Sequence, residues 1–369
     1  MPAKKSSPTQ KKSLLTSKPL LLLSTSLAAS YFLHQSYLAA HKKSFQGENV
    51  LVTGASSGIG ALLAKRFAKE KIANLVLIAR SLPQLHEVKK EIQKEHPHVN
   101  VIVESVDVAN KDQIYDFQKK LSREIGDIGV LILNAGIVSG KKFLEQTDAD
   151  AERLMQVNTM SHFYLTRAFL PGMLKRNKGH IITIASVAAT IGVGRMTDYG
   201  ASKFGAFAFN EALRAELRSM GRHASNAKRG EGVQVLCMCP YYIDTGMFKN
   251  VQNNNVPFLI PILKPDDVVE RTMLGAKRCE QLVVMPYSCW SIFIARGLLP
   301  GKIFDKIMYD VLGVQKTIQG FDHSKTGRAS IHDTVKTDRA TGGPSSDRSS
   351  HLPQDYATVG RGPVIQSRM

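Results

Sequence analysis

The sequence predicts an α/β protein with a single doubly wound parallel sheet and helices on both of its faces. Short apolar runs alternate with longer amphipathic segments over residues 47–319, which is typical of strands joined by single helices. Strands joined in this way need right-handed crossovers, so they pair in parallel and are covered on both faces. The hydrophobic content of 43% is enough to form a sizeable core.

The expected elements follow one another in a regular order. The strands are expected at Asn49–Gly54, Asn74–Ala79, Val99–Val108, Gly129–Asn134, His180–Ala185, Val233–Cys239 and Gln281–Met285. The helices are expected at Ile59–Lys71, from about Ser81, at 110–125, 147–176 and 197–220, and from Pro265. Ser81 is suited to cap its helix and Pro83 to lie in the first turn.

The composition excludes several classes of protein. The four cysteines, Cys237, Cys239, Cys279 and Cys289, are too few for a disulfide scaffold and lack the spacing of a metal site. Part of the net charge of +18 lies in residues 1–46, which carry seven lysines and no acidic residue. No nucleic-acid-binding signature accompanies this charge, and net charge alone indicates only non-specific attraction. We therefore expect no metal and no nucleic-acid partner, and assign the charge to a membrane surface or an anionic cofactor.

The N-terminal residues have the pattern of a membrane segment. Five lysines precede an uncharged run, Leu20–Ala40, and a His-Lys-Lys cluster follows it. A helix over this run would be about 30 Å long, the thickness of a bilayer core. An uncleaved anchor is favoured over a cleaved signal peptide ending near Ala40 and over a shallow interfacial segment. A hairpin or monotopic anchor leaves the following domain in the cytosol, whereas a single span places it in the lumen.

The last residues, 320–369, are rich in Ser, Thr, Gly, Arg and Asp and show no apolar periodicity. Too little apolar area is present there to offset the ordering entropy, so a disordered tail is expected. The chain thus divides into a basic N-terminus (1–46), one folded domain (47–319) and a tail (320–369).

The first strand runs into a loop rich in glycine. Its glycines permit a tight turn, allow the backbone to approach a pyrophosphate and direct a helix N-terminus at the phosphate charge. The loop follows a strand and opens a helix, which is the context that dinucleotide binding requires. The residues of this loop expected to bind the cofactor are Gly54, Ser56, Ser57, Gly58, Ile59 and Gly60.

The ends of the next strands indicate which dinucleotide binds. The second strand ends at Ala79-Arg80, without the acidic residue that would hold the ribose hydroxyls of NAD. The guanidinium of Arg80 suits a 2′-phosphate, so NADP is favoured. If Arg80 only stacks on the adenine, NAD is the alternative. Asp107 and Val108 follow the third strand at the expected adenine edge, and Asn134, Ala135 and Gly136 follow the fourth, beneath the cofactor.

Four polar residues form a candidate catalytic group. Tyr199 and Lys203 lie four residues apart on an expected helix and therefore share a face. A nearby ammonium group stabilises the phenolate and lowers the tyrosine pKa, so Tyr199 can exchange a proton with a substrate oxygen. Ser186, at the end of the fifth strand, is placed to hydrogen-bond that oxygen, and Asn158 to hold a water between Lys203 and solvent. With the glycine-rich loop, these residues indicate hydride transfer at a carbonyl carbon.

With these motifs in this order, the sequence resembles the short-chain dehydrogenase/reductase family over roughly residues 47–319. The resemblance rests on Thr53–Gly60, Asn134-Ala135-Gly136, Asn158, Ser186, Tyr199 and Lys203. It implies a Rossmann-type domain with a Tyr/Lys/Ser/Asn tetrad, in which Tyr199 and Lys203 also contact the cofactor. It also implies that the helices at 147–176 and 197–220 pair between the subunits of a homodimer.

The stretch from Cys239 to Phe248 and the N-terminal apolar run are similar to the membrane-bound branch of retinol and 17-beta-hydroxysteroid dehydrogenases. This resemblance implies cofactor contacts for Pro240 and Thr245, location at the endoplasmic reticulum membrane or a lipid droplet, and a catalytic domain in the cytosol. The family usually has glycine where this chain has Tyr241. Some retinol-oxidising relatives have an acidic residue in place of Arg80 and prefer NAD, which leaves the direction of the reaction open.

Two apolar regions lie in the last part of the domain, 241–319. Residues 241–263 form the expected substrate loop, because an apolar flap suits a lipophilic alcohol or ketone; packing on the core is the alternative. The residues expected to contact the substrate are Ser186, Tyr199, Tyr241, Tyr242, Met247 and Phe248. Residues 287–304 combine Trp290 with apolar and basic residues, which suits membrane contact or packing against the sheet edge.

The sequence thus predicts a membrane-associated, NADP-dependent oxidoreductase that interconverts a lipophilic alcohol and its carbonyl, such as a retinoid, a steroid or a long-chain lipid. A reductase of 3-ketosphinganine-type lipid ketones is the alternative within the same reaction class. A non-catalytic NADP-binding redox sensor or scaffold is disfavoured, because it would have no need to keep Tyr199 and Lys203 together.

Overall fold

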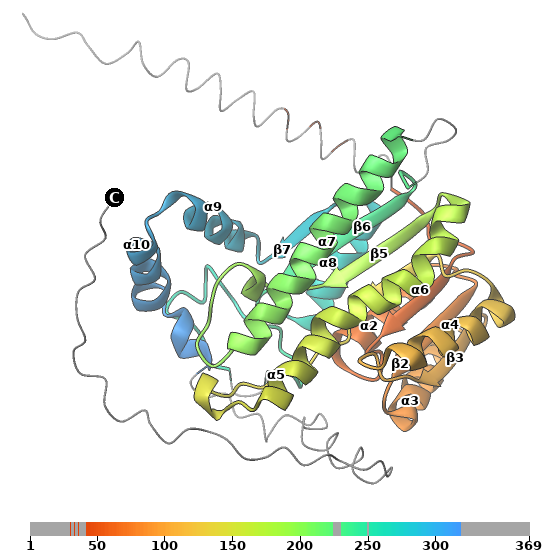
Figure 1. Ribbon diagram of the computed structural model, residues 1–369, viewed down its shortest axis with the longest axis horizontal. Coiled ribbons are helices and arrows are strands. Elements are labelled where there is room, and N and C mark those ends of the chain that lie inside the picture. The colour runs from red at the N-terminus through yellow and green to blue at the C-terminus, as the bar shows by residue number, and fades with distance from the viewer. Residues whose placement is uncertain are drawn as a thin grey trace, which may run out of the picture. The chain divides into compact units, whose positions relative to one another are not determined.

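The computed structural model describes residues 42–223, 230–248 and 251–318, together with Ser30, Leu33 and Ser36. In these residues seven strands form one sheet in the order β3-β2-β1-β4-β5-β6-β7, and each neighbouring pair is parallel. The predicted doubly wound α/β fold is therefore confirmed (Figure 1). The predicted membrane segment, but for those three single residues, and the predicted tail lie outside this part of the chain. None of the helices described is long and apolar enough to cross a membrane.

Most elements begin and end within a few residues of the predicted positions. The strands are β1 (Asn49–Thr53), β2 (Asn74–Ala79), β3 (Asn100–Ser105), β4 (Val130–Leu133), β5 (Gly179–Ile184), β6 (Val233–Pro240) and β7 (Leu282–Met285). The helices that join or follow them are α2 (Gly58–Ala68), α3 (Leu82–Glu95), α4 (Lys111–Ile125), α5 (Asp148–Met155), α6 (Ser161–Arg176), α7 (Thr197–His223) and α8 (Pro265–Lys277). β2 has the bounds that the sequence predicts.

Two local predictions need correction. The third strand is shorter than expected, because the N–H of Asn110 donates to the carbonyl of Asp107 (2.9 Å) and turns the chain. Asp107 and Val108 therefore lie in the loop after β3. Ser81 occupies the N-cap position of α3, as predicted, but its side chain makes no cap hydrogen bond.

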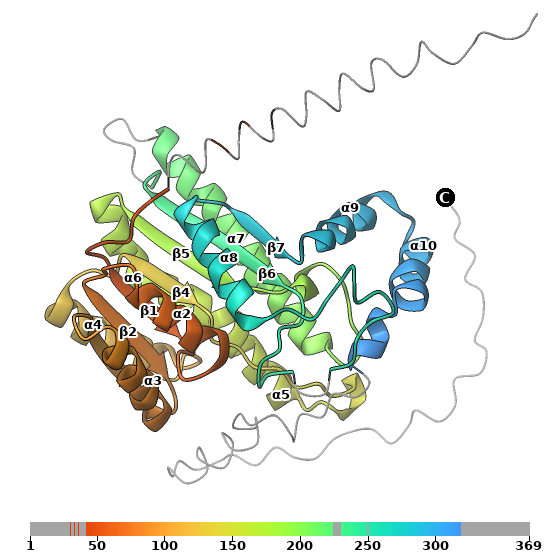
Figure 2. The same cartoon turned by 180° about the vertical axis from the view of Figure 1, so that it is seen from behind.

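Helices cover both faces of the sheet. Val50 and Val52 of β1 belong to one apolar cluster, and Leu51 belongs to the other. The first cluster packs against α2, α3 and α8, and the second against α4, α6 and α7, as Figures 1 and 2 show from opposite sides. Because both faces of the central strands are buried, their sequences are continuous apolar runs.

The strand order reverses at β1, which lies between β2 and β4. The loops that follow β1 and β4 therefore leave the sheet next to each other and lead to helices on opposite faces. Doubly wound sheets bind their ligands in the crevice at this point, outside the carboxyl ends of the strands. The glycine-rich loop and Asn134-Ala135-Gly136 are the two loops concerned.

A π-turn interrupts the single long helix predicted at 147–176. The structure has α5, a π-helical turn (Gln156–Met160) and α6 in succession. A π-turn takes in an additional residue and shifts the following side chains around the helix. Asn158 lies in this turn and is fully buried. Tertiary contacts of Asn158, described below, account for a turn that helix periodicity does not predict.

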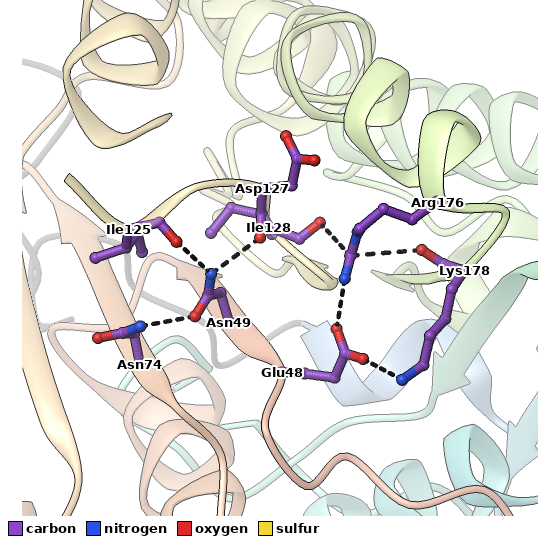
Figure 3. A network of polar contacts seen from close by, with 8 residues as sticks. All are labelled: Glu48, Asn49, Asn74, Ile125, Asp127, Ile128, Arg176 and Lys178. Carbon is purple, nitrogen blue, oxygen red and sulfur yellow. Dashed lines mark hydrogen bonds and ion pairs between the residues drawn. The ribbon is translucent and has the colours of Figure 1, made fainter. Parts of the chain in front are cut away.

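An asparagine ladder joins the amino ends of the first three strands (Figure 3). Asn49, Asn74 and Asn100 begin β1, β2 and β3 in register. Asn100 Nδ2 donates to Asn74 Oδ1 (2.6 Å), and Asn74 Nδ2 donates to Asn49 Oδ1 (2.7 Å). Asn49 Nδ2 donates in turn to the carbonyl oxygens of Ile125 and Asp127 (2.9 and 3.0 Å). The ladder satisfies polar groups at the edge of the sheet opposite the glycine-rich loop.

Glu48 ties the start of β1 to the start of β5. Its side chain is 8% exposed and pairs with Arg176 (3.4 Å) and Lys178 (2.5 Å), which flank the connection from α6 to β5 (Figure 3). Arg176 also donates to the carbonyl of Ile128 (3.4 Å). Two cations thus compensate one buried carboxylate, as a buried charge requires.

The packed part of the chain begins ahead of Gly47. The N–H of Lys43 donates to the carbonyl of Lys277 (2.7 Å). Phe45 is 1% exposed, and its ring lies against those of Phe67 and His180, with centroids 5.2 and 5.3 Å apart. Residues 43–46 are therefore fastened to the amino edge of the sheet.

The end of the described chain forms short helical segments beyond β7. These are α9 (Trp290–Leu298), α10 (Gly301–Asp305), a π-helical turn (Lys306–Val311) and a 3-10 turn (Val314–Ile318). Both views place α9 and α10 at the β7 side of the sheet (Figures 1 and 2). Phe304, Met308, Val314 and Ile318 are buried in the same apolar cluster as Tyr199. This segment is therefore an integral part of the domain.

Candidate active site

Hydrogen bonds join the two loops at the point where the strand order reverses. Thr53 Oγ1 accepts from the N–H groups of Asn134 (2.9 Å) and Ala135 (3.0 Å). Asn134 Nδ2 donates to the carbonyl of Thr53 (2.9 Å). Asn134 therefore links the end of β1 to the end of β4 and fixes the backbone where the glycine-rich loop begins.

The glycines of the loop leave no room for side chains. Gly54 and Gly58 have φ angles of +64° and +57°, which favour glycine. A Cβ on Gly60 would lie 2.3 Å from the carbonyl oxygen of Gly54 and 2.4 Å from Asn134 Nδ2. Ser56, Ser57 and Ile59 complete the loop, and no acidic residue lies in the first turn of α2. A tight, bare backbone at a helix N-terminus fits the pyrophosphate of a dinucleotide.

Arg80 and Asp107 follow neighbouring strands at the edge where the adenosine is expected. Arg80 is exposed directly after β2, and its carbonyl accepts from Ser105 Oγ (2.9 Å). Asp107 Oδ2 pairs with Arg153 of α5 (2.6 Å), and its Oδ1 accepts from a backbone N–H two residues on (3.0 Å). Val108 is buried in the core. Arg153, which the sequence did not indicate, therefore neutralises the one carboxylate predicted for this edge.

Asn158 holds the backbone that follows Asn134-Ala135-Gly136. Its Oδ1 accepts from the N–H of Ile137 (2.8 Å), and its Nδ2 donates to the carbonyl of Ile137 (2.9 Å) and to Ser202 Oγ (3.0 Å). Both Nδ2 hydrogens are therefore used, and Oδ1 accepts one hydrogen bond. The second lone pair of Oδ1 is the remaining group that could bind the water expected from the sequence. A Cβ on Gly136 would lie 3.4 Å from Asn158 Oδ1 and 3.5 Å from Lys203 Nζ, so Asn158 and Lys203 meet at Gly136.

Tyr199 and Lys203 lie one turn apart on α7, and both are buried, with 5% and 4% exposure. Lys203 Nζ is 5.7 Å from the centroid of the Tyr199 ring and donates to the carbonyl of Ile184 (2.9 Å). Burial lowers the pKa of Lys203 to about 8. The ammonium form therefore still predominates at neutral pH, close enough to the phenol ring to favour its ionisation.

Ser186 lies between the ends of β5 and β6. Its Oγ accepts from a backbone N–H two residues on (3.0 Å) and donates to the carbonyl of Pro240 (3.4 Å). The 3-10 turn that Ser186 opens, Val187–Ala189, packs against α7. Thr245 is engaged within the next loop, where its Oγ1 accepts from the N–H of Met247 (3.4 Å).

Aromatic rings connect Tyr199 to the loop after β6. The ring of Phe248 lies 5.9 Å from that of Tyr199 and 5.1 Å from that of Tyr242, between centroids. Tyr242 and Tyr241 are 4.8 Å apart, and all three pairs are close to perpendicular. Burial raises the pKa of Tyr241 and of Tyr242, so both hydroxyls stay protonated. The predicted proton donor is thus flanked by an apolar aromatic wall.

The comparison with known proteins agrees with this arrangement. The family model for short chain dehydrogenases matches residues 48–256. The chain belongs to the short-chain dehydrogenase family. It is accordingly an oxidoreductase that acts on alcohols or carbonyls with a nicotinamide dinucleotide.

Relatives of this short-chain dehydrogenase include enzymes named for lipophilic alcohols. Estradiol 17-beta-dehydrogenase 11 of Mus musculus is 35% identical over 279 residues, which cover 74% of this chain and 87% of the relative. Retinol dehydrogenase 10-A of Danio rerio is 32% identical and covers 78% of this chain and 91% of its own. A short-chain dehydrogenase from Sphingobium yanoikuyae in complex with NADPH is 26% identical, with a TM-score of 0.56 over 77% of this chain and 98% of that one.

Ser202 is a polar residue of this dehydrogenase that the sequence alone did not single out. It is fully buried, its Oγ donates to the carbonyl of Tyr199 (2.8 Å) and it accepts from Asn158 Nδ2. Ser202 thereby links the π-turn to the first turn of α7. Serines often bond back to their own helix, so the residue type alone does not mark Ser202 as part of the site. Its position in the sequence between Tyr199 and Lys203 is the one feature that could have identified it.

Proposed function

We propose that this dehydrogenase is membrane-associated, uses NADP, and interconverts a lipophilic alcohol and its carbonyl of the retinoid, steroid or long-chain lipid class. The observation that carries the proposal is Tyr199, one turn from the buried Lys203 and in ring contact with Phe248, at the carboxyl edge of the sheet. This arrangement joins a proton donor to an apolar wall. The relatives named for estradiol and retinol support the same substrate class.

Each residue of the tetrad has a separate task in the proposal. The nicotinamide of the bound cofactor would supply or accept the hydride. Tyr199 donates a proton to the carbonyl oxygen in reduction and removes it from the hydroxyl in oxidation. Lys203 lowers the pKa of the Tyr199 hydroxyl. Ser186 can exchange its long hydrogen bond to the carbonyl of Pro240 (3.4 Å) for a hydrogen bond to the substrate oxygen. Asn158 keeps the backbone after Gly136 in place, where it would lie under the nicotinamide ring.

The charge at the adenosine edge supports NADP as the cofactor. Arg80 follows β2, and Arg153 compensates Asp107 on the neighbouring loop. The edge therefore carries two guanidinium groups and one carboxylate, which favours an additional phosphate. The NADPH complex of the Sphingobium yanoikuyae enzyme, which is 26% identical, also supports this choice.

Replacing Arg80 with aspartate should reverse the cofactor preference. The substitution exchanges a partner of the 2′-phosphate for a group that repels it, so affinity for NADPH should fall about 10- to 100-fold, while affinity for NADH is kept or improves. Fluorescence titration of both cofactors measures the effect, and Arg123→Asp, on the exposed side of α4, is the matched control. Equal loss of both affinities would show that Arg80 does not select the cofactor.

An exposed apolar surface on α9, α10 and the turn after them supports membrane contact. Its exposed members are Ile294 (59%), Leu298 (77%), Ile303 (50%), Ile307 (36%) and Val311 (57%). Three exposed cations, Arg296, Lys302 and Lys306, outnumber the two exposed acidic residues of the same stretch, Asp305 and Asp310, and this excess of positive charge suits an anionic lipid surface. Trp290 and Phe293, by contrast, pack against each other and on the core (centroids 5.4 Å apart). The exposed aliphatic side chains are therefore the proposed points of insertion.

Two membrane attachments should be separable by mutation. Deletion of residues 1–41 removes the Leu20–Ala40 run but keeps Lys43 and Phe45, so the domain should stay folded and float with anionic liposomes less completely than the full chain. Adding Leu298→Glu and Ile303→Glu should abolish flotation, because each places a charge on the apolar surface. The matched control is Leu144→Glu, at a 94% exposed leucine outside this surface.

Two results of the flotation assay would contradict this assignment. If the deleted chain floats as completely as the full chain, Leu20–Ala40 is not the principal anchor. If the deleted chain with Leu298→Glu and Ile303→Glu floats as well as the deleted chain with the control substitution Leu144→Glu, the surface on α9 and α10 does not contact lipid.

The proposal places the protein at the endoplasmic reticulum membrane or a lipid droplet, with its catalytic domain in the cytosol. All four cysteines are unpaired, which is usual for a domain in a reducing compartment. The function is tested with full-length protein in membranes, supplied with retinoid, steroid and sphingoid alcohols and ketones and with NADP(H) or NAD(H). Turnover of none of these substrates with either cofactor would refute the proposed function.

A further inference from the structure

The last described residues connect two loops of the proposed active site. Residues 309–318 are here called the C-terminal brace. One loop, 190–196, leads from the turn after Ser186 to the helix that carries Tyr199, and the other, 251–256, belongs to the expected substrate loop. The family model ends at residue 256, so the brace lies beyond the part of the chain that it matches.

The brace is bonded to the first loop through two side chains. Tyr309 Oη donates to the carbonyl of Gly192 (2.8 Å), and Gln315 Oε1 accepts from the N–H of Gly194 (3.0 Å). A Cβ on Gly194 would lie 2.3 Å from Gln315 Nε2. Gln315 therefore lies directly on the backbone of this loop at Gly194.

Backbone groups and one asparagine bond the brace to the second loop. Asn255 donates through its N–H to the carbonyl of Leu312 (3.0 Å) and through Nδ2 to the carbonyl of Val311 (2.9 Å). The N–H of Gln252 donates to the carbonyl of Thr317 (3.1 Å). The two loops, about 60 residues apart in sequence, are thus held to one short segment.

The inner side of the brace is apolar and adjoins the predicted substrate residues. Val314 and Ile318 are buried in the cluster that contains Tyr199, Tyr241 and Tyr242. Thr317 is 1% exposed, its hydroxyl donates to the carbonyl of Val314 (2.7 Å), and its side chain offsets part of the rise in the pKa of Tyr241 and Tyr242 that burial causes. The brace therefore reaches the aromatic wall beside the proton donor.

We propose that the C-terminal brace is a wall of the substrate site and sets the size of the apolar group that the site accepts, with Tyr309 and Gln315 as positioning residues. The inference rests on the proposed function. Because the brace bonds to both loops, it fixes their separation. A bulky ketone needs contact with both loops, whereas a one-ring ketone does not, so loosening the brace acts on the bulky substrate first.

The test compares two ketones with NADPH on the full chain. Tyr309→Phe combined with Gln315→Ala removes the two bonds to the first loop, and Asp310→Asn, at an exposed brace residue, is the control. For the double variant we expect KM for estrone to rise about tenfold, with kcat for cyclohexanone and the NADPH affinity close to wild type. Hydrogen–deuterium exchange should accelerate in both 190–196 and 251–256, and in neither loop of the control.

An unchanged ratio of kcat/KM for the two ketones would overturn the proposal, and so would an equal loss for both together with weaker NADPH binding. Hydrogen exchange gives an answer that does not depend on activity. If wild-type protein turns over neither ketone nor any substrate of the wider panel, the proposed function fails. Wild-type exchange rates in both loops of the double variant would refute the brace itself.

Discussion

Tyr199→Phe should lower turnover by about 10²- to 10⁴-fold, the usual contribution of a general acid or base, and leave NADP(H) binding close to wild type. The substitution removes only the hydroxyl that transfers the proton. The phenyl ring that remains can keep its perpendicular contact with Phe248, so the fold and the aromatic wall should persist. Steady-state kinetics of ketone reduction and fluorescence titration of NADPH measure the two quantities separately.

Tyr164→Phe is the matched control for this substitution. Tyr164 lies on α6, donates to Gln156 Oε1 (3.3 Å) and packs on the apolar cluster that does not contain Tyr199. Its loss of a hydroxyl should leave turnover unchanged. A Tyr199→Phe enzyme with wild-type turnover would refute the proposed proton transfer, and a variant that no longer binds NADPH would show that Tyr199 has a structural role instead.

Gly60→Ala should weaken NADPH binding by about 30-fold. The new methyl group would meet the carbonyl oxygen of Gly54 and the amide of Asn134, which joins β1 to β4. The carbonyl oxygen belongs to the backbone, and the Asn134 amide is held by its hydrogen bond to Thr53, so α2 must move away from the loop. Overpacking of this kind costs about 2 kcal/mol, equivalent to about 30-fold in affinity when the strain falls on the bound state.

Gly297→Ala provides the comparison, because a Cβ at Gly297 in α9 would meet nothing within 4 Å. Alanine is the better helix former by up to about 1 kcal/mol, so this variant should bind NADPH normally and melt no lower than wild type. Thermal melting with and without NADPH distinguishes the two variants. Normal NADPH affinity in Gly60→Ala would show that the glycine-rich loop is not the pyrophosphate site.

The sheet was predictable because burial on both faces leaves a direct trace in sequence. β2 is a continuous apolar run, Asn74–Ala79, and its bounds agree with the prediction. The same holds for the order of strands and helices, since each crossover needs one amphipathic helix. The residues proposed for the site lie at strand ends and on α7, where sequence spacing alone is informative.

The features that could not be predicted depend on contacts between distant residues. The π-turn at 156–160 looks like ordinary helix in sequence, and it forms where Asn158 bonds the backbone of Ile137. The sequence places Asp107 at the adenine edge but gives no sign of its ion pair with Arg153, 46 residues away. The C-terminal brace depends on Gln315 meeting Gly194, 121 residues away. No periodicity in the sequence encodes such pairs.

The fastening of residues 43–46 has a practical consequence for coupling this enzyme to a solid support. Lys43 and Phe45 are held at the amino edge of a sheet whose strands all run the same way, and the cofactor loops leave from the carboxyl edge. A synthetic linker attached in place of residues 1–41 would therefore hold the protein at the amino edge of the sheet, opposite those loops. On a bead or an electrode, the dinucleotide would reach its loops from the bulk solution without passing the support.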